Sequence, residues 1–251
     1  LAKFKRPLLV HAEIQLDSDI HMEKIAHVDA RSYTTYLKTR PPSWEQAAIR
    51  ELHRVVQDTR GGGTAEGAHL HIVHLSDASI SLDIIKDAKS SGASLSVETC
   101  PHYLAFSAEQ IKDGDTRFKC APPIRDEANR QKLWQELMDE HIDMLSSDHS
   151  PTLPQLKLLD EGDFLRAWGG ISSLQGAIVG GNYADIVVWD PDKVLELDEH
   201  YKHYLKHPNI SAYMGTRLSG EVLSTFVKGN LVYNKGKHAP AACGVPILAK
   251  R

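Results

Sequence analysis

Four polar side chains stand where short apolar segments of this sequence end. They are His11 after residues 7–10, His74 in segment 69–75, Glu98 after 93–97 and Asp148 after 142–145. In parallel α/β folds, functional groups collect at the carboxyl ends of the strands. Two imidazoles and a carboxylate suit a divalent transition metal, although a histidine at a strand end is often only structural. Both interpretations stay open at this point.

The segments around these residues alternate between strand and helix patterns. Apolar positions at helical spacing predict an amphipathic helix over 43–59, with Ser43-Trp44-Glu45-Gln46 as a capping box. A second helix follows Ser76 or Asp77 and stops at Gly92, and Asp126 can cap a third. Residues 14–40 show no clean period. Strands that alternate with helices predict a parallel α/β architecture.

The pattern of apolar residues changes after residue 150. Residues 151–183 contain no segment of helical period longer than about two turns. Residues 184–189 read as a strand, and Lys228-Gly229-Asn230 lies between two strand-like runs as a hairpin signal. We therefore expect a β-rich C-terminal quarter.

Other candidate sites are weaker. Alternation along a strand puts His69 and His71 on the face opposite to His74, so we interpret the first two as structural or surface residues. The glycine run 61–63 lacks the Lys-Ser/Thr ending of a phosphate loop. Cys100 near His102 could suggest a thiol nucleophile, but a buried, inert cysteine is the favoured interpretation.

Composition excludes several classes of function. The 251 residues carry 29 basic and 33 acidic side chains, a net charge of −4 that offers no electrostatic basis for binding nucleic acid or anionic membrane. No apolar run approaches the roughly 20 residues of a membrane helix. Three cysteines are too few for a disulfide framework. We expect a small-molecule substrate and an intracellular location, cytoplasmic by default.

Five motifs, in this order, strongly resemble the cyclic-amide branch of the metal-dependent amidohydrolases, and most closely its plant allantoinases. They are Leu9-Val10-His11-Ala12-Glu13, Val73-His74-Leu75-Ser76, Glu98-Thr99-Cys100-Pro101-His102-Tyr103, Lys119-Cys120-Ala121-Pro122-Pro123-Ile124-Arg125 and Ser147-Asp148-His149-Ser150-Pro151. The closing Lys237-His238-Ala239-Pro240-Ala241-Ala242-Cys243-Gly244 is also specific to this family. The resemblance implies a TIM barrel that hydrolyses the cyclic amide of allantoin to allantoate in purine catabolism.

The resemblance also implies roles for particular residues. By motif, His11 and His74 match ligands of the second of two divalent metal ions, zinc most often, with cobalt or manganese as alternatives. Asp148 matches the ligand of the first metal, which also serves as general acid and base. Backbone groups near Trp168 and Gly169 match a loop that contacts substrate.

The sequence also departs from the family pattern. Nothing in residues 1–10 supplies the His-x-His pair of the first barrel strand, and only Lys3 and Lys5 precede His11 as candidates for the bridging, carboxylated lysine. Leu174-Gln175-Gly176-Ala177 joins segments that the family separates by helices. We therefore expect a partial (β/α)₈ barrel over 1–175, a small β-rich domain over 176–251, and impaired metal binding and turnover in this chain alone.

Two alternatives remain. The chain could be another cyclic-amide hydrolase, a dihydroorotase or a dihydropyrimidinase, or a non-catalytic relative that serves as an interaction protein. Retention of His11, His74 and Asp148 favours an enzyme. These expectations leave room for a homo-oligomer, and for the endoplasmic reticulum if a leader precedes Leu1.

Overall fold

The computed structural model describes residues 7–16, 28–59, 68–171, 186–201, 207–227 and 230–241. By its contacts the chain divides into two compact units, Leu1–Ile178 with Leu205–Ala212, and Val179–Tyr204 with Tyr213–Arg251. Lys3, Lys5, the glycine run 61–63 and the junction at Gln175-Gly176 lie outside the described residues, and so does the predicted domain boundary. None of the described helices combines the length and the apolar character that crossing a membrane requires.

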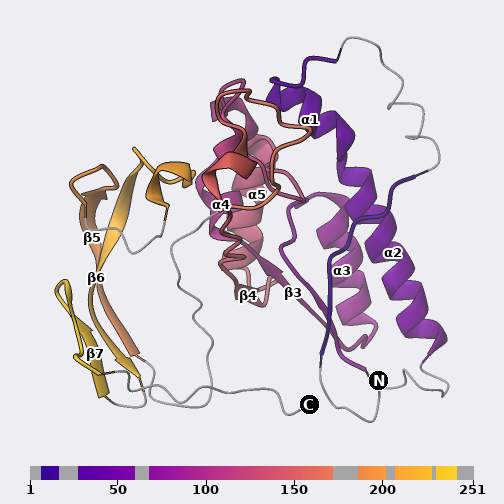
Figure 1. Cartoon of the computed structure of the whole chain (residues 1–251). Helices are drawn as coiled ribbons and strands as arrows, with labels where there is room; N and C mark the ends of the chain where they lie inside the picture. The colour runs from indigo at the N-terminus through magenta and orange to yellow at the C-terminus, as the bar shows by residue number, and fades with distance from the viewer. Residues whose placement is uncertain are drawn as a thin grey trace. The chain divides into compact units, whose positions relative to one another are not determined.

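A four-stranded parallel sheet organises the first unit. Its order is β1 (Leu8–Val10), β2 (Leu70–Ile72), β3 (Leu95–Thr99) and β4 (Met144–Leu145), so sequence neighbours are also neighbours in the sheet (Figure 1). The register pairs Val10 with Ile72 and Ile72 with Val97. All three pairings are parallel, so the four carboxyl ends meet at one edge, as the alternating sequence pattern predicts.

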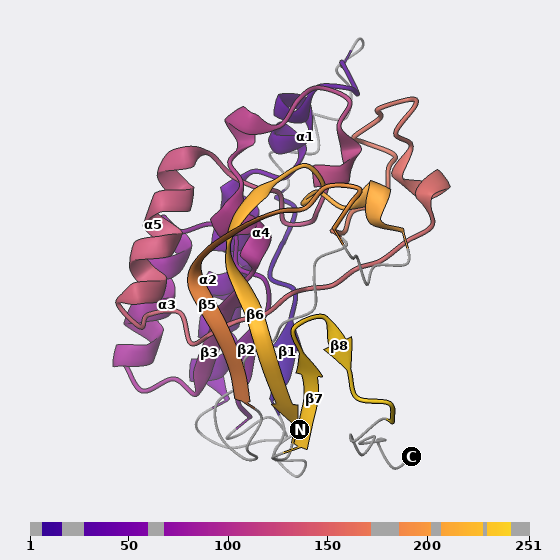
Figure 2. The same cartoon turned by 90° about the vertical axis from the view of Figure 1, so that its left-hand side faces the viewer.

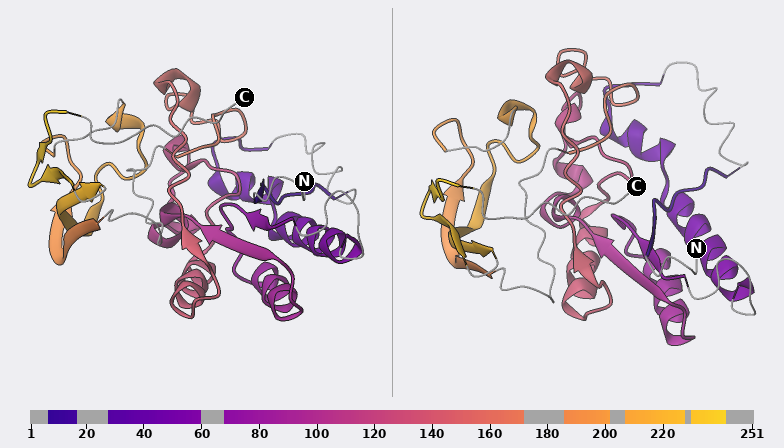
Figure 3. Two further views of the ribbon diagram at one scale, coloured as in Figure 1. Left: turned by 90° about the horizontal axis from the view of Figure 1, so that it is seen from below. Right: turned by 60° about the horizontal axis from the view of Figure 1, so that its bottom comes forward.

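Helices cover one face of this sheet. The α-helices are α1 (Tyr33–Thr39), α2 (Pro42–Asp58), α3 (Ile80–Ser90), α4 (Pro101–Ala105) and α5 (Glu127–Met138). Figure 3 shows α2, α3 and α5 side by side along the strands. Ile49 of α2 and Ile85 of α3 are buried, as is Leu133 of α5, and these apolar side chains account for the helical periods seen in the sequence.

Short 3₁₀ helices occupy the connecting segments, namely η3 (Ala108–Gln110), η4 (Thr116–Phe118), η5 (Pro154–Lys157) and, also in the first unit, η6 (Pro208–Ile210). In the described part of 151–183, the four-residue η5 is the one helical element, as the sequence pattern predicts.

The predicted cap of α2 was wrong, and one helix formed where the sequence shows no pattern. Ser43 does not cap α2, because that helix already begins at Pro42 with Pro41 at its N-cap and no side-chain capping bond. The segment 14–40, which showed no clean period, contains α1. Two buried aromatic side chains of α1, Tyr33 and Tyr36, donate hydrogen bonds to the carbonyls of Ile124 and Cys120. Tertiary contacts of this kind leave no periodic signal in so short a helix.

The predicted cap of α5 is confirmed, whereas that of α3 was placed too early in the chain, because the N-cap of α3 is Ser79 and neither Ser76 nor Asp77. Asp126 accepts a hydrogen bond from the Asn129 amide at 2.8 Å and caps α5. The Asp77 carboxylate accepts bonds from the amides of Ser79 and Ser81 at the start of α3. Gly92, at φ +80°, ends the same helix in a conformation that a residue with a side chain rarely adopts.

The second unit is an antiparallel sheet. Its strands, β5 (Ile186–Glu196), β6 (Arg217–Val227), β7 (Asn230–Asn234) and β8 (Lys237–His238), pair in sequence order (Figure 2). β6 and β7 pair from Val227 and Asn230, and Lys228 and Gly229 of the predicted hairpin lie outside the described residues. The C-terminal part is therefore β-rich, as expected.

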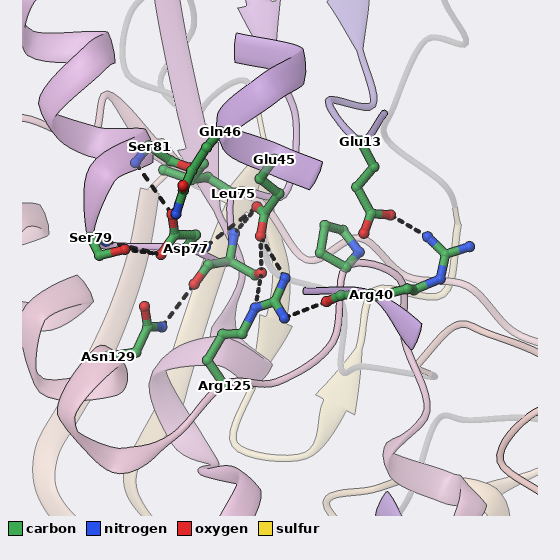
Figure 4. A network of polar contacts seen from close by, with 12 residues as sticks. Glu13, Arg40, Glu45, Gln46, Leu75, Asp77, Ser79, Ser81, Arg125 and Asn129 are labelled. Atoms are coloured by element: carbon green, nitrogen blue, oxygen red, sulfur yellow. Dashed lines mark hydrogen bonds and ion pairs between the residues drawn. The ribbon is translucent and has the colours of Figure 1, made fainter. Parts of the chain in front are cut away.

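A buried ion pair ties α2 to the loops at the carboxyl edge of the parallel sheet. The Arg125 Nη2 lies 3.0 Å from Glu45 Oε2, and Glu45 is 1 % exposed (Figure 4). The Ser76 hydroxyl and amide also donate to this carboxylate, at 2.6 and 2.9 Å. Arg125 donates in turn to the carbonyl of Arg40 at 2.6 Å. Burial raises the pKa of Glu45, and Arg125 and Ser76 oppose that rise.

We predict that Glu45→Gln lowers the free energy of unfolding by about 3–5 kcal/mol, because it leaves the buried Arg125 guanidinium without its counter-charge. The double variant Glu45→Met/Arg125→Met should lose less than the sum of the single variants Glu45→Met and Arg125→Met. Denaturant unfolding measures all of these, with Glu51→Gln on the exposed face of α2 as a control that should change little. Additive losses in the double variant would contradict the prediction.

Candidate functional site

Two histidines meet at the carboxyl edge of the parallel sheet. His11 follows β1 directly and His74 follows β2 by two residues. The His11 Nδ1 lies 2.9 Å from the His74 Nε2, and the rings are tilted by 71°. The structure thus brings together the two predicted imidazoles, although 63 residues separate them in sequence. They point the nitrogens that could share a metal ion toward each other.

Asp148 is the third predicted site residue, and it follows β4 by three positions at the same edge. His74 and Asp148 have φ angles of +42° and +41°, in the left-handed region that residues other than glycine rarely adopt. Such strained positions cost about 1–3 kcal/mol each and cluster at functional sites. Two of the three residues that the sequence had indicated therefore have this backbone conformation, which Glu140, Leu158 and Lys235 also adopt.

Electrostatics couple the three residues. Burial lowers the pKa of His74, the charge of His11 lowers it further, and Asp148 opposes the shift. Burial raises the pKa of Asp148, while His74 and His11 favour its charged form. His11 differs from His74 in that its side chain is 45 % exposed, and its Nε2 lies 2.8 Å from the Glu13 carboxylate. Glu13 in turn contacts Arg40.

Glu98, the fourth strand-end residue of the sequence analysis, has a supporting position. Its carboxylate lies 2.9 Å from the His71 Nε2, and it also accepts a bond from the His74 amide at 3.4 Å. His69 and His71 contact the hydroxyl of Ser96, each at 2.7 Å. These bonds agree with the structural interpretation of His69 and His71, and they make Glu98 a residue that fixes the backbone of His74.

The loop at Trp168 and Gly169 lies beside the segment that carries Asp148. Trp168 is 45 % exposed, and its Nε1 lies 3.3 Å from the hydroxyl of Ser150. The Ser150 amide donates to the carbonyl of Ile171 at 3.0 Å. The structure therefore places these two predicted substrate contacts next to the Asp148 segment.

A buried lysine that the sequence analysis missed holds this loop. Lys157 is 1 % exposed, and its Nζ lies 3.3 Å from the carbonyl oxygens of both Lys119 and Trp168. It also donates to the carbonyls of Thr116, Arg117 and Gly170. A lysine at the end of the short helix η5 carries no sequence signal for such a role, because its partners are backbone atoms of two separate segments, 116–119 and 168–170.

The sequence is similar to allantoinases along nearly its whole length. It is 58% identical to the allantoinase of Arabidopsis thaliana over 99% of this chain, and 56% identical to a probable allantoinase of rice (Oryza sativa subsp. japonica) over 100% of it. The matches cover 56% and 57% of those two proteins, so the chain spans little more than half their length. No family model matches the chain.

Solved structures show the same fold. The L-hydantoinase (dihydropyrimidinase) from Arthrobacter aurescens superposes with a TM-score of 0.75 at 22% identity, over 95% of this chain and 59% of that one. A D-hydantoinase superposes with a TM-score of 0.72 over 94% of this chain. The expected fold class, part of a (β/α)₈ barrel with a small β-rich part, is confirmed.

We predict that Lys157→Met destabilises the chain by at least about 2 kcal/mol at neutral pH, because several buried carbonyls lose their donor. Burial lowers the pKa of Lys157 from 10.5 to about 8. Between these values the unfolded chain binds more protons than the folded one, so the free energy of unfolding rises with pH. The stability gap between the unaltered chain and Lys157→Met should therefore widen from pH 8 to 10.5. Chemical denaturation at several pH values measures this gap, with the exposed Lys38→Met as control; a constant gap would contradict the assignment.

Proposed function

We propose that this chain belongs to the allantoinases, a family of metal-dependent cyclic-amide hydrolases, and that its carboxyl-edge site hydrolyses the cyclic amide of allantoin to allantoate. The observation that carries the proposal is the convergence of His11 and His74 beside Asp148 at one edge of the sheet. These are the residues whose motifs match the family's ligands and its general base.

The two imidazoles fit a divalent metal ion. Ligand nitrogens that share one zinc ion at about 2.0–2.1 Å lie about 3.4 Å apart, close to the 2.9 Å between His11 Nδ1 and His74 Nε2. The same two nitrogens face each other without a carboxylate between them. We propose that His11 and His74 hold one divalent ion and that Asp148 is a ligand of a two-metal centre. Zinc, cobalt and manganese all accept this donor set.

Asp148 performs the proton transfers in this proposal. When bound, the divalent ions supply Lewis acidity for the ring carbonyl and lower the pKa of the attacking water. Asp148 accepts the proton of that water as the oxygen adds to the carbonyl carbon. It then returns the proton to the ring nitrogen as the carbon–nitrogen bond breaks, so that the ring opens to a free amide nitrogen and a carboxylic acid, which releases the second proton of the water to solvent.

The surrounding residues position the reactants. Glu98 fixes the His74 backbone through its amide, and Glu13 lies against the outer nitrogen of His11. An outer-shell carboxylate of this kind sets which imidazole nitrogen is free for a metal. The backbone near Trp168 and Gly169, beside Ser150, is proposed to contact the substrate ring. A homo-oligomer and the compartment stay predictions from the sequence.

We predict that Asp148→Asn reduces allantoin hydrolysis by about 10²–10⁴-fold, because the amide cannot accept the proton of the attacking water. The assay follows allantoate formation by the purified chain, with dihydroorotate and dihydrouracil as competing substrates. Asp139→Asn, at the C-terminal end of α5, is the matched control and should keep the unaltered rate. Preferential turnover of dihydroorotate or dihydrouracil would assign the site to a different cyclic amide.

We also predict that a chelator abolishes the hydrolysis and that added Zn²⁺, Co²⁺ or Mn²⁺ restores it. The double variant His11→Ala/His74→Ala should need a metal concentration at least about tenfold higher for half-maximal rate. The reason is that it lacks two metal ligands, and loss of even a residue that only supports a ligand lowers metal affinity by about 10–100-fold. A rate that is unchanged after exhaustive chelation, with the metal content verified, would rule out the proposed chemistry.

A further inference from the structure

A second group of potential ligands lies next to Asp148. The ligand atoms of Cys100, His102 and Asp148 all lie within 4.8 Å of one another. Cys100 and His102 are both 0 % exposed, whereas Asp148 is half-buried. Among the described residues, no other group of three potential ligands has its ligand atoms this close together. His11 and His74 do not belong to this group.

His102 supplies an independent observation. Both of its ring nitrogens are buried, and neither has a hydrogen-bond partner among the described residues. An unpaired buried polar group costs free energy, and native structures pair nearly all of them. The imidazole packs edge-on against the Tyr103 ring, with centroids 4.3 Å apart, which holds the ring but satisfies neither nitrogen. A ligand in the space that His102 shares with Cys100 and Asp148 would supply a partner for one of these two nitrogens.

We propose that Cys100, His102 and Asp148 form a binding site for a borderline-soft divalent cation such as Zn²⁺. Thiolate, imidazole and carboxylate together are a donor set that zinc accepts, with a fourth position left for water. In a tetrahedral site of this kind the donor atoms lie about 3.5 Å apart. Side-chain rotations that move the donor atoms by about 1 Å would therefore bring them to the distances of a metal site. Cys100 binds the cation as a thiolate and releases its proton to solvent. The cation reaches the site past Asp148, which is half-buried, whereas Cys100 and His102 are fully buried.

The scaffold around the three residues supports a defined geometry. Cys100 follows β3 directly, and His102 lies two residues later in α4. The hydroxyl of Tyr103 donates to the carbonyl of Pro122 at 2.7 Å, which fixes α4 to the segment that carries Cys120. Cys100 and His102 therefore lie on a secured turn, and only Asp148 comes from a separate strand end.

This site does not rest on the proposed hydrolase function, although it shares Asp148 with it. The two sites differ in their chemistry, because the hydrolase ligands are nitrogen and oxygen atoms and only the second site contains sulfur. Occupation of the thiolate site draws the Asp148 carboxylate toward Cys100. A sulfur-specific signal can therefore detect the second site whether or not the chain hydrolyses allantoin.

Cobalt substitution supplies that signal. We expect the metal-free chain titrated with CoCl₂ to develop the near-ultraviolet thiolate-to-cobalt charge-transfer absorption, which nitrogen and oxygen ligands do not produce. Cys100→Ala should abolish the band, and His102→Gln should weaken Co²⁺ binding by at least about tenfold. Cys120→Ala is the matched control, since Cys120 is also buried but lies outside the group, and it should keep the band.

One further variant separates the two sites, and another replaces Cys100→Ala if that variant does not fold. His11→Ala/His74→Ala should keep the charge-transfer band even if hydrolysis is lost. Cys100→Ser preserves the size of the side chain, so it serves should Cys100→Ala not fold, as judged by circular dichroism and thermal unfolding. Absence of the band from the folded, unaltered chain overturns the proposal, and so does its persistence in Cys100→Ala or Cys100→Ser.

Discussion

The buried pair of Glu45 and Arg125 is the interaction on which the carboxyl edge of the sheet depends. Glu45 stands on the first turn of α2 and accepts the hydroxyl and amide of Ser76, two residues beyond His74. Arg125 ends the motif that begins at Lys119 and contacts the same carboxylate. One charged pair thus fixes a helix, the loop after β2 and the loop before α5, and an isolated charge at this depth could not persist.

Two of the site residues at the carboxyl edge have strained backbone conformations and are partly removed from water. His74 and Asp148 adopt left-handed backbone conformations, and burial shifts the pKa of each in the direction of its neutral form. Opposite charges nearby offset part of that cost. Asp148 belongs to both proposed ligand sets, one with the imidazoles of His11 and His74 and the other with the Cys100 thiol and the His102 imidazole. A half-buried carboxylate in this position can both transfer protons and bind a metal ion, because burial favours its protonated form and nearby positive charge favours its ionised form.

Much of the fold could be predicted from local signals. Helices α2, α3 and α5 follow apolar positions at helical spacing, strands β1 to β4 fall on short apolar segments, and Asp126 caps α5 as the sequence predicts. Ser43 does not cap α2, because that helix already begins at Pro42 and the predicted box partner Gln46 donates to Asp77 instead. Helix α1 forms because Tyr33 and Tyr36 reach backbone carbonyls some 80–90 residues away.

The sequence by itself determined the types of the site residues and their places at successive strand ends, because strand period and parallel topology fix where such residues emerge. It could not determine which of them touch. Tertiary structure decided that His11 faces His74, that Glu98 contacts His71 and that Lys157 donates to distant carbonyls. It also decided that His102 is buried with no hydrogen-bond partner for its ring within the described ranges. Contacts of this kind join atoms far apart in the chain, and their energies depend on burial, which no local pattern records.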